Sequence, residues 1–332
     1  MVKIAVVGAG AWGRNLVRNY ATVPGGGLYA CCDTDPKQRE KLARQYPGAK
    51  VTGNLDEVLS DPAVDGVVIA APAVAHYELA KKSLLAGKHT YVEKPLTLRV
   101  EHAEELVELS HKQGRILMVG HLLEYHPAVL YLKKLIDSGE LGKVYYLYSQ
   151  RVNLGKIRSD ENALWSFAPH DISIILMLLG KAPTRVLASG QAYLQKKIED
   201  VVFLIMHFDD GVMAQIQVSW LDPHKIRRTT VVGSRKMVVF DDQEATDKIK
   251  IYDRGVKEAG EVVSYGLQVR FGDIHVPWMD MTEPLAIECK QFVDSIREGV
   301  PPRTDGEDGL RVVRVLDAAQ RSLDSGGASV EL

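Results

Sequence analysis

From residue 1 to about residue 122, short apolar runs alternate with amphipathic stretches, which predicts a parallel sheet covered by helices on both faces. The predicted strands are 4–7, 29–32, a short one near Val51, 66–70, 89–92 and 116–119. Before the last strand, apolar residues recur at helical spacing from Val100, and Gly114 is expected to end that helix. The number of strands is that of a complete dinucleotide-binding fold.

After about residue 122, apolar and polar positions alternate, as in strands with one covered face. Strands are predicted at 143–152, 185–193, 201–208, 212–220, 228–232 and 236–240, with hairpin turns at 209–211 and 233–235. Helices are predicted at 127–138, around 171–179, at 283–298 and at 307–324, and the polar stretch 246–266 is expected to be flexible. We therefore expect an α/β Rossmann domain over 1–122 and an α+β domain with a largely antiparallel, open-faced sheet over 123–332.

The composition, 46% hydrophobic and 25% charged over 332 residues, is that of a soluble globular protein with two domains. A formal net charge of -2 offers no electrostatic surface for nucleic acid or an acidic membrane. Cys31, Cys32 and Cys289 have neither zinc spacing nor a disulfide pattern, which favours a reducing cytoplasm. The first strand begins at residue 2 and no apolar stretch approaches the roughly 20 residues that span a bilayer, so we expect no leader and no membrane segment.

The first strand ends in Gly8-x-Gly10-x-x-Gly13, and Asp33 follows the second strand. Gly8 permits the tight turn, Gly10 lets the backbone approach a pyrophosphate, and Gly13 lets the next helix pack closely on the strand. The N-terminal N–H groups of that helix would face the phosphates. The motif in this context predicts a dinucleotide site.

The acidic residue at the end of the second strand bears on which dinucleotide is bound. A carboxylate at Asp33 can accept hydrogen bonds from the ribose hydroxyls and would repel a 2'-phosphate, so NAD is favoured over NADP. Asp35 adds to that repulsion, whereas Lys37 and Arg39 could soften it.

Two segments carry candidate chemistry. The fifth strand ends in Glu93-Lys94-Pro95, which places Lys94 at the edge of the sheet where ligands bind; the proline indicates a constrained geometry, of which a cis bond is one form. In the segment 165–171, a helix that begins near Pro169 would place His170 at its N-terminus, with Ser166 just before it. A helix N-terminus disfavours imidazolium, so a neutral His170 could accept a proton. A histidine beside an apolar helix can equally be structural.

These features together resemble the glucose-fructose oxidoreductase/inositol dehydrogenase/MocA family over essentially the whole chain, including the ending Thr304-Asp305-Gly306 and the long helix after it. In that family the lysine of E-K-P and the histidine of a D-x-x-x-H motif form the catalytic pair, so the resemblance implies Lys94 and His170 here. Ser166 stands where the motif has aspartate. Either Ser166 merely holds a substrate hydroxyl, or a water or another residue completes the proton path.

The resemblance also implies NAD as cofactor and further contacts to it. Pro72 and His76 resemble the family's loop near the nicotinamide, and Trp12 lies inside the glycine motif. The expected cofactor contacts are Gly8, Gly10, Ala11, Trp12, Gly13, Asp33, Thr34, Pro72, His76, Glu93 and Lys94. No metal is expected.

The segment 151–158, together with the segment 165–171, resembles the branch that acts on UDP-linked N-acetylated amino sugars and their uronates in surface-polysaccharide synthesis. Basic residues at 156–158 and 225–228 could bind a diphosphate, although each group could equally be a solvated loop. The expected substrate contacts are Lys94, Tyr125, Asn153, Arg158, Ser166 and His170. The alternatives are a dehydrogenase of a free sugar or inositol-type polyol and a non-catalytic NAD-binding sensor. By resemblance, the open-faced sheet implies a homodimer or homotetramer.

Overall fold

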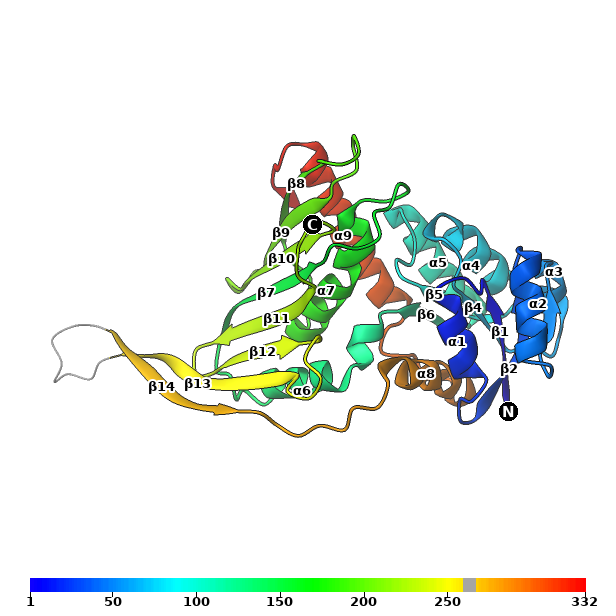
Figure 1. The fold of residues 1–332 in the computed structure, drawn as a ribbon, viewed down its shortest axis with the longest axis horizontal. Coiled ribbons are helices and arrows are strands. Elements are labelled where there is room, and N and C mark those ends of the chain that lie inside the picture. Colours follow the sequence, from blue (N-terminus) through cyan, green and yellow to red (C-terminus); the bar gives the residue numbers. More distant parts are fainter. Residues whose placement is uncertain (259–266) are drawn as a thin grey trace. The chain divides into compact units, whose positions relative to one another are not determined.

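The structure, a computed structural model, describes residues 1–258 and 267–332 (Figure 1). It divides into two compact units, of which the first comprises 1–125 and 282–313 and the second 126–281 and 314–332. The expected division at residue 122 assigned everything after it to the second domain. In the structure, residues 282–313 belong to the first unit, because the apolar face of this segment, including Cys289 and Phe292, is buried in the first unit's core.

The first unit is built on a six-stranded parallel sheet, as the sequence predicted, and its strand order is β3-β2-β1-β4-β5-β6. Its strands are β1 (Val2–Val7), β2 (Gly26–Cys32), β3 (Lys50–Thr52), β4 (Gly66–Ile69), β5 (His89–Glu93) and β6 (Leu117–Gly120). Nearly all residues of β1, β4 and β6 are buried, which is why they form continuous apolar runs. Strands β1 to β3 are added toward one edge of the sheet and β4 to β6 toward the other, so the strand order switches between β1 and β4. Dinucleotides bind at such a switch point in folds of this kind.

Helices cover both faces of this sheet. The helical segments of the first unit are α1 (Gly13–Tyr20), α2 (Pro36–Gln45), α3 (Leu55–Ser60), η1 (Ala73–Ala75), α4 (His76–Leu85), α5 (Val100–Gln113), η2 (Leu122–Tyr125) and α8 (Pro284–Glu298). The side chains of α1 and α8 pack in one apolar cluster, and those of α4 and α5 in another. Gly114 ends α5 in the left-handed conformation, as expected. Within the described residues, no helix has both the length and the apolar character needed to cross a membrane.

The second unit is built on a nine-stranded sheet in the order β14-β13-β12-β11-β7-β10-β9-β8-β15. Its strands are β7 (Val144–Val152), β8 (Arg185–Gln191), β9 (Val201–His207), β10 (Met213–Ser219), β11 (Ile226–Gly233), β12 (Met237–Asp241), β13 (Ile249–Glu258), β14 (Leu267–His275) and β15 (Val330–Glu331). All pairs are antiparallel except β7 with β10. Both predicted hairpins, β9–β10 and β11–β12, are confirmed.

The expectation of a flexible stretch at 246–266 was wrong for its middle part. Residues 249–258 form β13, in which Ile249 and Ile251 are buried and alternate with polar residues. The polar composition concealed this period-two pattern. Residues 259–266 of the stretch lie outside the described residues.

Helices of the second unit lie against its sheet: α6 (Pro127–Asp137) packs on β12, and α7 (Ala163–Leu179) packs on β7, β9 and β10. Helix α9 (Gly306–Asp324) begins in the first unit and ends in the second. Helix α7 starts earlier than predicted. Asn162 caps it by accepting a hydrogen bond from the Trp165 N–H, and Pro169 lies inside it.

Candidate functional site

The glycine loop between β1 and α1 is fixed by steric contacts. Gly8 has a φ of +89°, and its N–H donates to the Cys32 carbonyl oxygen at 2.8 Å. A Cβ on Gly8 would lie 2.9 Å from the Ala70 backbone, and a Cβ on Gly13 would lie 2.0 Å from the Gly8 carbonyl oxygen. Glycine at both positions is therefore required by the packing of the first unit itself.

Gly10 differs from the other two glycines. A Cβ placed there would have no heavy atom within 4 Å among the described residues, so the protein's own packing does not demand glycine. A dinucleotide explains it, because the second glycine of the motif lets the backbone approach the pyrophosphate. The loop therefore fits the cofactor that the motif predicts.

A cavity of about 450 Å³ lies beside this loop and is lined mainly by apolar residues together with Asp33 and Thr34. Pro72 lies on its wall. One Asp33 oxygen accepts from the Ala9 N–H at 2.7 Å and the other from the Asp35 N–H at 2.8 Å. Each carboxylate oxygen has a second lone pair, so the ribose hydroxyls can still donate to it. The volume and the apolar wall suit a nucleoside.

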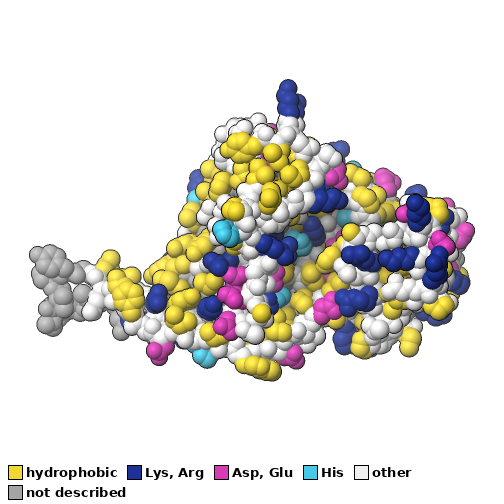
Figure 2. All heavy atoms as spheres, in the orientation of Figure 1, with side chains coloured by type: hydrophobic (Ala, Val, Ile, Leu, Met, Phe, Trp, Pro, Cys, Tyr) yellow, Lys and Arg dark blue, Asp and Glu magenta, His cyan; other side chains and the backbone are white. Residues whose placement is uncertain are grey.

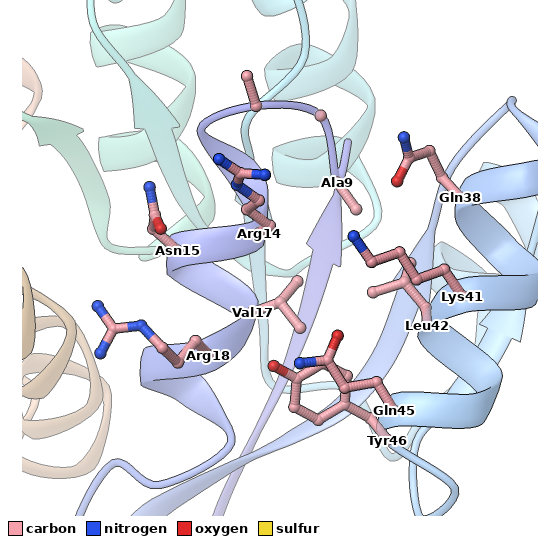
Figure 3. A pocket seen from close by; sticks show the side chains of 12 residues that line it. Ala9, Arg14, Asn15, Val17, Arg18, Gln38, Lys41, Leu42, Gln45 and Tyr46 are labelled. Carbon is pink, nitrogen blue, oxygen red and sulfur yellow. The ribbon is translucent and has the colours of Figure 1, made fainter.

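A second cavity, of about 520 Å³, lies between α1 and α2 and reaches Gly10 and Ala11 (Figure 3). In Figure 3 the side chains of Arg14 and Lys41 extend toward it from opposite helices. Its cationic lining places positive charge next to the glycine loop, which favours an anionic ligand there. Arg39, which could have softened the repulsion of a 2'-phosphate, instead donates to the carbonyl oxygens of Asp33 and Thr34.

The end of β5 is tied to the glycine loop by a buried carboxylate. Glu93 is 8% exposed, and its Oε1 accepts from the Trp12 indole N–H at 2.6 Å and from the Tyr91 hydroxyl at 3.1 Å. Burial raises the pKa of Glu93, against the lowering effects of the Trp12 hydrogen bond and of the nearby Lys94. Lys94 itself is half-buried, and the bond to Pro95 is cis. Trp12 and Glu93 thus hold the two loops of the predicted cofactor site together.

A second carboxyl group lies in the core beneath this turn. Glu288 of α8 is fully buried, and burial together with the proximity of Glu93 raises the pKa of Glu288 well above its usual range. Both effects favour the neutral form of Glu288. Sequence analysis missed it, since a single glutamate in an amphipathic helix carries no motif.

Helix α7 arranges the candidate residues of the second unit. Ser166 and His170 are one helical turn apart and share a face of α7. The expectation that His170 begins the helix was wrong, because Asn162 caps α7 two turns before it. The argument that a helix N-terminus disfavours its imidazolium form therefore does not apply.

Comparison with known proteins agrees with both units. A family model described as "Oxidoreductase family, NAD-binding Rossmann fold" matches residues 2–121, and the "GFO/IDH/MocA C-terminal domain" matches residues 129–239. The chain belongs to the GFO/IDH/MocA family. The resemblance and the two-domain fold expected from the sequence are thereby confirmed.

Relatives within the GFO/IDH/MocA family differ in the substrates that their names state. UDP-N-acetylglucosamine 3-dehydrogenase of Acidithiobacillus ferrooxidans is 27% identical over 94% of each chain. The scyllo-inositol 2-dehydrogenase (NAD(+)) of Bacillus subtilis is 27% identical over 98% of this chain and 95% of its own. The crystal structure of GenD2 from gentamicin A biosynthesis, in complex with NAD, superposes with a TM-score of 0.84 at 27% identity over 100% of this chain and 96% of that one. The comparisons therefore support a sugar dehydrogenase without fixing its substrate.

Two residues expected to contact ligands are engaged in the core of the first unit. His76 is 1% exposed, and its ring nitrogens lie 2.7 Å from the Pro95 carbonyl oxygen and 2.9 Å from that of Ala71. Tyr125 is also 1% exposed, and its hydroxyl lies 3.0 Å from the Thr304 hydroxyl. His76 therefore holds the Lys94-Pro95 turn in place, and Tyr125 packs among apolar residues.

Two of the basic residues expected near a diphosphate, Arg158 and Arg228, are paired with carboxylates. Arg158 pairs with Asp160 at 3.1 Å and with Glu161 at 2.8 Å, and Arg228 pairs with Asp241 at 2.7 Å. Asn153 follows the end of β7, half-buried. Arg227 remains apart from these ion pairs.

The structure also brings together a buried group that the sequence did not indicate. His121, Glu124 and Asp308 offer ligand atoms within 4.8 Å of one another. The Asp308 Oδ2 lies 2.6 Å from the His121 Nδ1, and Asp308 also pairs with Arg311. Burial, and then the charge of Asp308, raise the pKa of Glu124 well above its usual range. These effects favour the neutral form of Glu124, and the Asp308 carboxylate is already paired with His121 and Arg311.

Proposed function

We propose that this member of the GFO/IDH/MocA family is an NAD-dependent dehydrogenase that oxidises a secondary hydroxyl of a sugar. The open space at Gly10, in a loop whose Ala9 N–H donates to Asp33, is the observation that carries the proposal. Asp33 supports NAD rather than NADP, because its carboxylate would oppose a 2'-phosphate. The substrate that we propose is a UDP-linked N-acetylated amino sugar, or its uronate, which is oxidised at C3.

In this proposal the glycine loop, Ala11, Thr34, Pro72 and Asp33 hold the dinucleotide. The bound nicotinamide supplies the hydride acceptor. Lys94 donates a hydrogen bond to the substrate oxygen and stabilises it as it loses its proton. His170 accepts that proton, and Ser166 positions the hydroxyl from the same helix face. The hydrogen bond between Trp12 and Glu93 holds the loop that carries Lys94 against the glycine loop.

The first experiment is a panel of nucleotide sugars and free polyols with NAD, followed at the nicotinamide absorbance band. Oxidation of UDP-N-acetylglucosamine or its uronate would support the nucleotide-sugar assignment. Oxidation of inositols or free sugars alone would support the polyol alternative, which the Bacillus subtilis relative favours.

A non-catalytic NAD-binding sensor is the remaining alternative, and the serine at position 166 favours it. Under that alternative NAD would bind, but no sugar in the panel would produce NADH. A Lys94→Ala variant that retains NAD binding and loses NADH production would exclude it.

We also propose that the second unit forms a homodimer or homotetramer through the open face of its sheet. Apolar side chains remain exposed there, among them Tyr146 at 40%, Phe203 at 43% and Met213 at 40%. Hydrophobic side chains are also visible along the β13–β14 hairpin in Figure 2, where Leu267 and Phe271 are 73% and 75% exposed. Exposed apolar patches of this kind mark association surfaces. Light scattering at several protein concentrations tests this proposal.

A further inference from the structure

Two arginines stand directly opposite each other on neighbouring strands of the second unit. In the antiparallel register of β7 and β11, Arg151 pairs with Arg227. Directly opposed residues point to the same face of a sheet. Arg151 reaches Asp171 of α7, so Arg227 also faces the side that the helix covers.

Arg151 has a complete counter-ion. Its Nε lies 2.6 Å from the Asp171 Oδ2, and its Nη2 lies 3.3 Å from the Oδ1. The same Oδ1 also accepts from the Ser149 hydroxyl. The Asp171 carboxylate is therefore occupied by Arg151 and Ser149.

Arg227 has no counter-ion among the residues that the structure describes. Its Nε is buried without a hydrogen-bond partner, and its guanidinium forms no ion pair with a carboxylate of residues 1–258 or 267–332. Asp241 is bound by Arg228. The side chain of Asp242 lies 3.7 Å from His126 and 3.9 Å from Lys248, while its backbone N–H donates to the Arg227 carbonyl oxygen.

This arrangement is costly for the ligand-free protein. Burial, and then the charge of Arg151, lower the pKa of Arg227, yet a guanidinium remains protonated at any pH at which proteins fold. The charges of Asp242 and Asp171 oppose this lowering of the pKa, but both carboxylates have other partners. An anion that pairs directly with Arg227 would offset the remaining cost of burying its charge. The planar guanidinium forms paired hydrogen bonds with carboxylates and phosphates in particular.

The position of Arg227 connects it to the proposed substrate site. Asp171, the counter-ion of its neighbour, directly follows His170 in α7. Asn153, an expected substrate contact, comes two residues after Arg151 at the end of β7. Arg227 therefore lies on the face of the sheet that carries the candidate substrate residues of this unit.

We propose that Arg227 binds an oxyanion of the substrate, either the carboxylate of a sugar acid or the phosphate of a nucleotide sugar. The proposal rests on the dehydrogenase function and names its substrate class as anionic. Arg228 provides a matched control, because it is the next residue of β11, faces the opposite side of the sheet and already has a carboxylate partner.

The test uses the full chain with saturating NAD, so that the dinucleotide site is filled, and measures binding of UDP and of glucuronate separately by calorimetry. UDP probes phosphate recognition, and glucuronate probes carboxylate recognition. We expect at least one of them to bind, Arg227→Gln to weaken that binding by about 10- to 100-fold, and Arg227→Lys to restore part of it. Arg228→Gln should bind as the wild type does.

Thermal unfolding without ligand provides a second readout. Because Arg227→Gln removes a repulsion, we expect the midpoint to rise by about 2 °C or more, whereas Arg228→Gln, which leaves Asp241 unpaired, should not raise it. A purely structural role for Arg227 predicts a lower midpoint in Arg227→Gln, and that result would overturn the proposal. So would a wild type that binds neither anion, or an Arg227→Gln variant that binds as the wild type does.

Failure of this proposal can be told apart from failure of the dehydrogenase function. If neutral inositol is oxidised with NAD and neither anion binds, the dehydrogenase stands and the anion site is refuted. If UDP binds through Arg227 but no sugar is oxidised, the anion site stands and the dehydrogenase is refuted.

Discussion

The carboxyl edge of the first sheet and the helix-covered face of the second sheet are built in different ways. At the first, backbone packing determines the residues: Gly8 and Gly13 are glycine because the fold has no room for a Cβ at either position. At the second, side-chain charges decide, and Arg151, Asp171 and Arg227 come from three separate elements. A site made by the backbone can hold one constant ligand, whereas a site made by side chains can change its substrate through a few substitutions. Relatives with one fold and differently named sugar substrates agree with this difference.

The largest expected effect comes from substituting the proposed catalytic residues, of which each region contributes one. Lys94→Ala should reduce kcat for NADH formation by about 10²- to 10⁴-fold with little change in NAD affinity, because the amine acts on the substrate oxygen. His170→Ala should cost a similar factor. Steady-state kinetics together with NAD binding check this. If either variant retains wild-type kcat, the proposed division of catalysis between the two regions is wrong.

Asp171→Asn should destabilise the second unit by about 3–5 kcal/mol, because it leaves Arg151 buried without a counter-ion. Urea unfolding measures this loss. Asp241→Asn is the matched control: its partner Arg228 is 46% exposed, so about 1 kcal/mol or less is expected. Equal losses in the free energy of unfolding of the two variants would show that the buried Arg151–Asp171 pair contributes no more to stability than the exposed Arg228–Asp241 pair.

The glycine loop offers a test of backbone packing rather than of side-chain charge. Gly13→Ala should lower the stability of the first unit by about 1–3 kcal/mol or prevent folding, since the added Cβ would lie 2.0 Å from the Gly8 carbonyl oxygen. Gly10→Ala should leave the unfolding midpoint nearly unchanged and weaken NAD binding by about tenfold or more. Thermal unfolding and calorimetry on the same samples separate the two effects. Loss of stability in Gly10→Ala without loss of NAD binding would contradict a ligand-imposed glycine.

The same contrast explains what the sequence could predict. The strands of the first sheet and the glycine loop were predicted correctly, because they depend on residues that are neighbours in the chain. The start of α7 was not, because Pro169 is compatible with a first turn, whereas the actual cap at Asn162 also bonds to Glu199 and Gln320. The Arg151–Arg227 opposition depends on strand register, which no local pattern supplies.

Two further features could not be predicted from the sequence for a related reason: α8 belongs to the first unit, and Glu288 is buried there. The pattern of an amphipathic helix predicts that one face is buried, but it does not predict which sheet covers that face. Likewise, the placement of His76 between two carbonyl oxygens requires the Lys94-Pro95 turn to be known first. Identifying a residue's type is a local inference, whereas identifying what surrounds it is not.

Asp33→Ser tests whether the dinucleotide cavity selects by charge. Removing the carboxylate should weaken NAD binding by about tenfold and improve NADP binding, so that the ratio of the two affinities changes by about 10- to 100-fold. Serine is small enough to leave the cavity open. The two dissociation constants measured side by side check the expectation. An unchanged ratio would mean that another group, such as the cations lining the second cavity, sets the preference.

The smallest expected effect is a loss of stability in acid, to which one histidine in each unit contributes. The Nδ1 of His89 in the first unit accepts from the Ile116 N–H at 3.0 Å, and that of His126 in the second accepts from the Ala128 N–H at 3.1 Å. Burial lowers the pKa of each histidine to about 4, with the charge of Arg115 assisting at His89.

Because these pKa values lie below the value of about 6.5 in an unfolded chain, the unfolded state takes up the protons first as pH falls. The contribution of each histidine is complete above about pH 6.5 and is lost progressively toward pH 4, by about 1 kcal/mol each after allowance for partial solvation. Urea midpoints at pH 7.5 and pH 5 should therefore differ less in His89→Gln and in His126→Asn, the latter because asparagine still caps α6. If both variants keep the wild-type pH dependence, protonation of these two histidines is not the cause of the acid sensitivity.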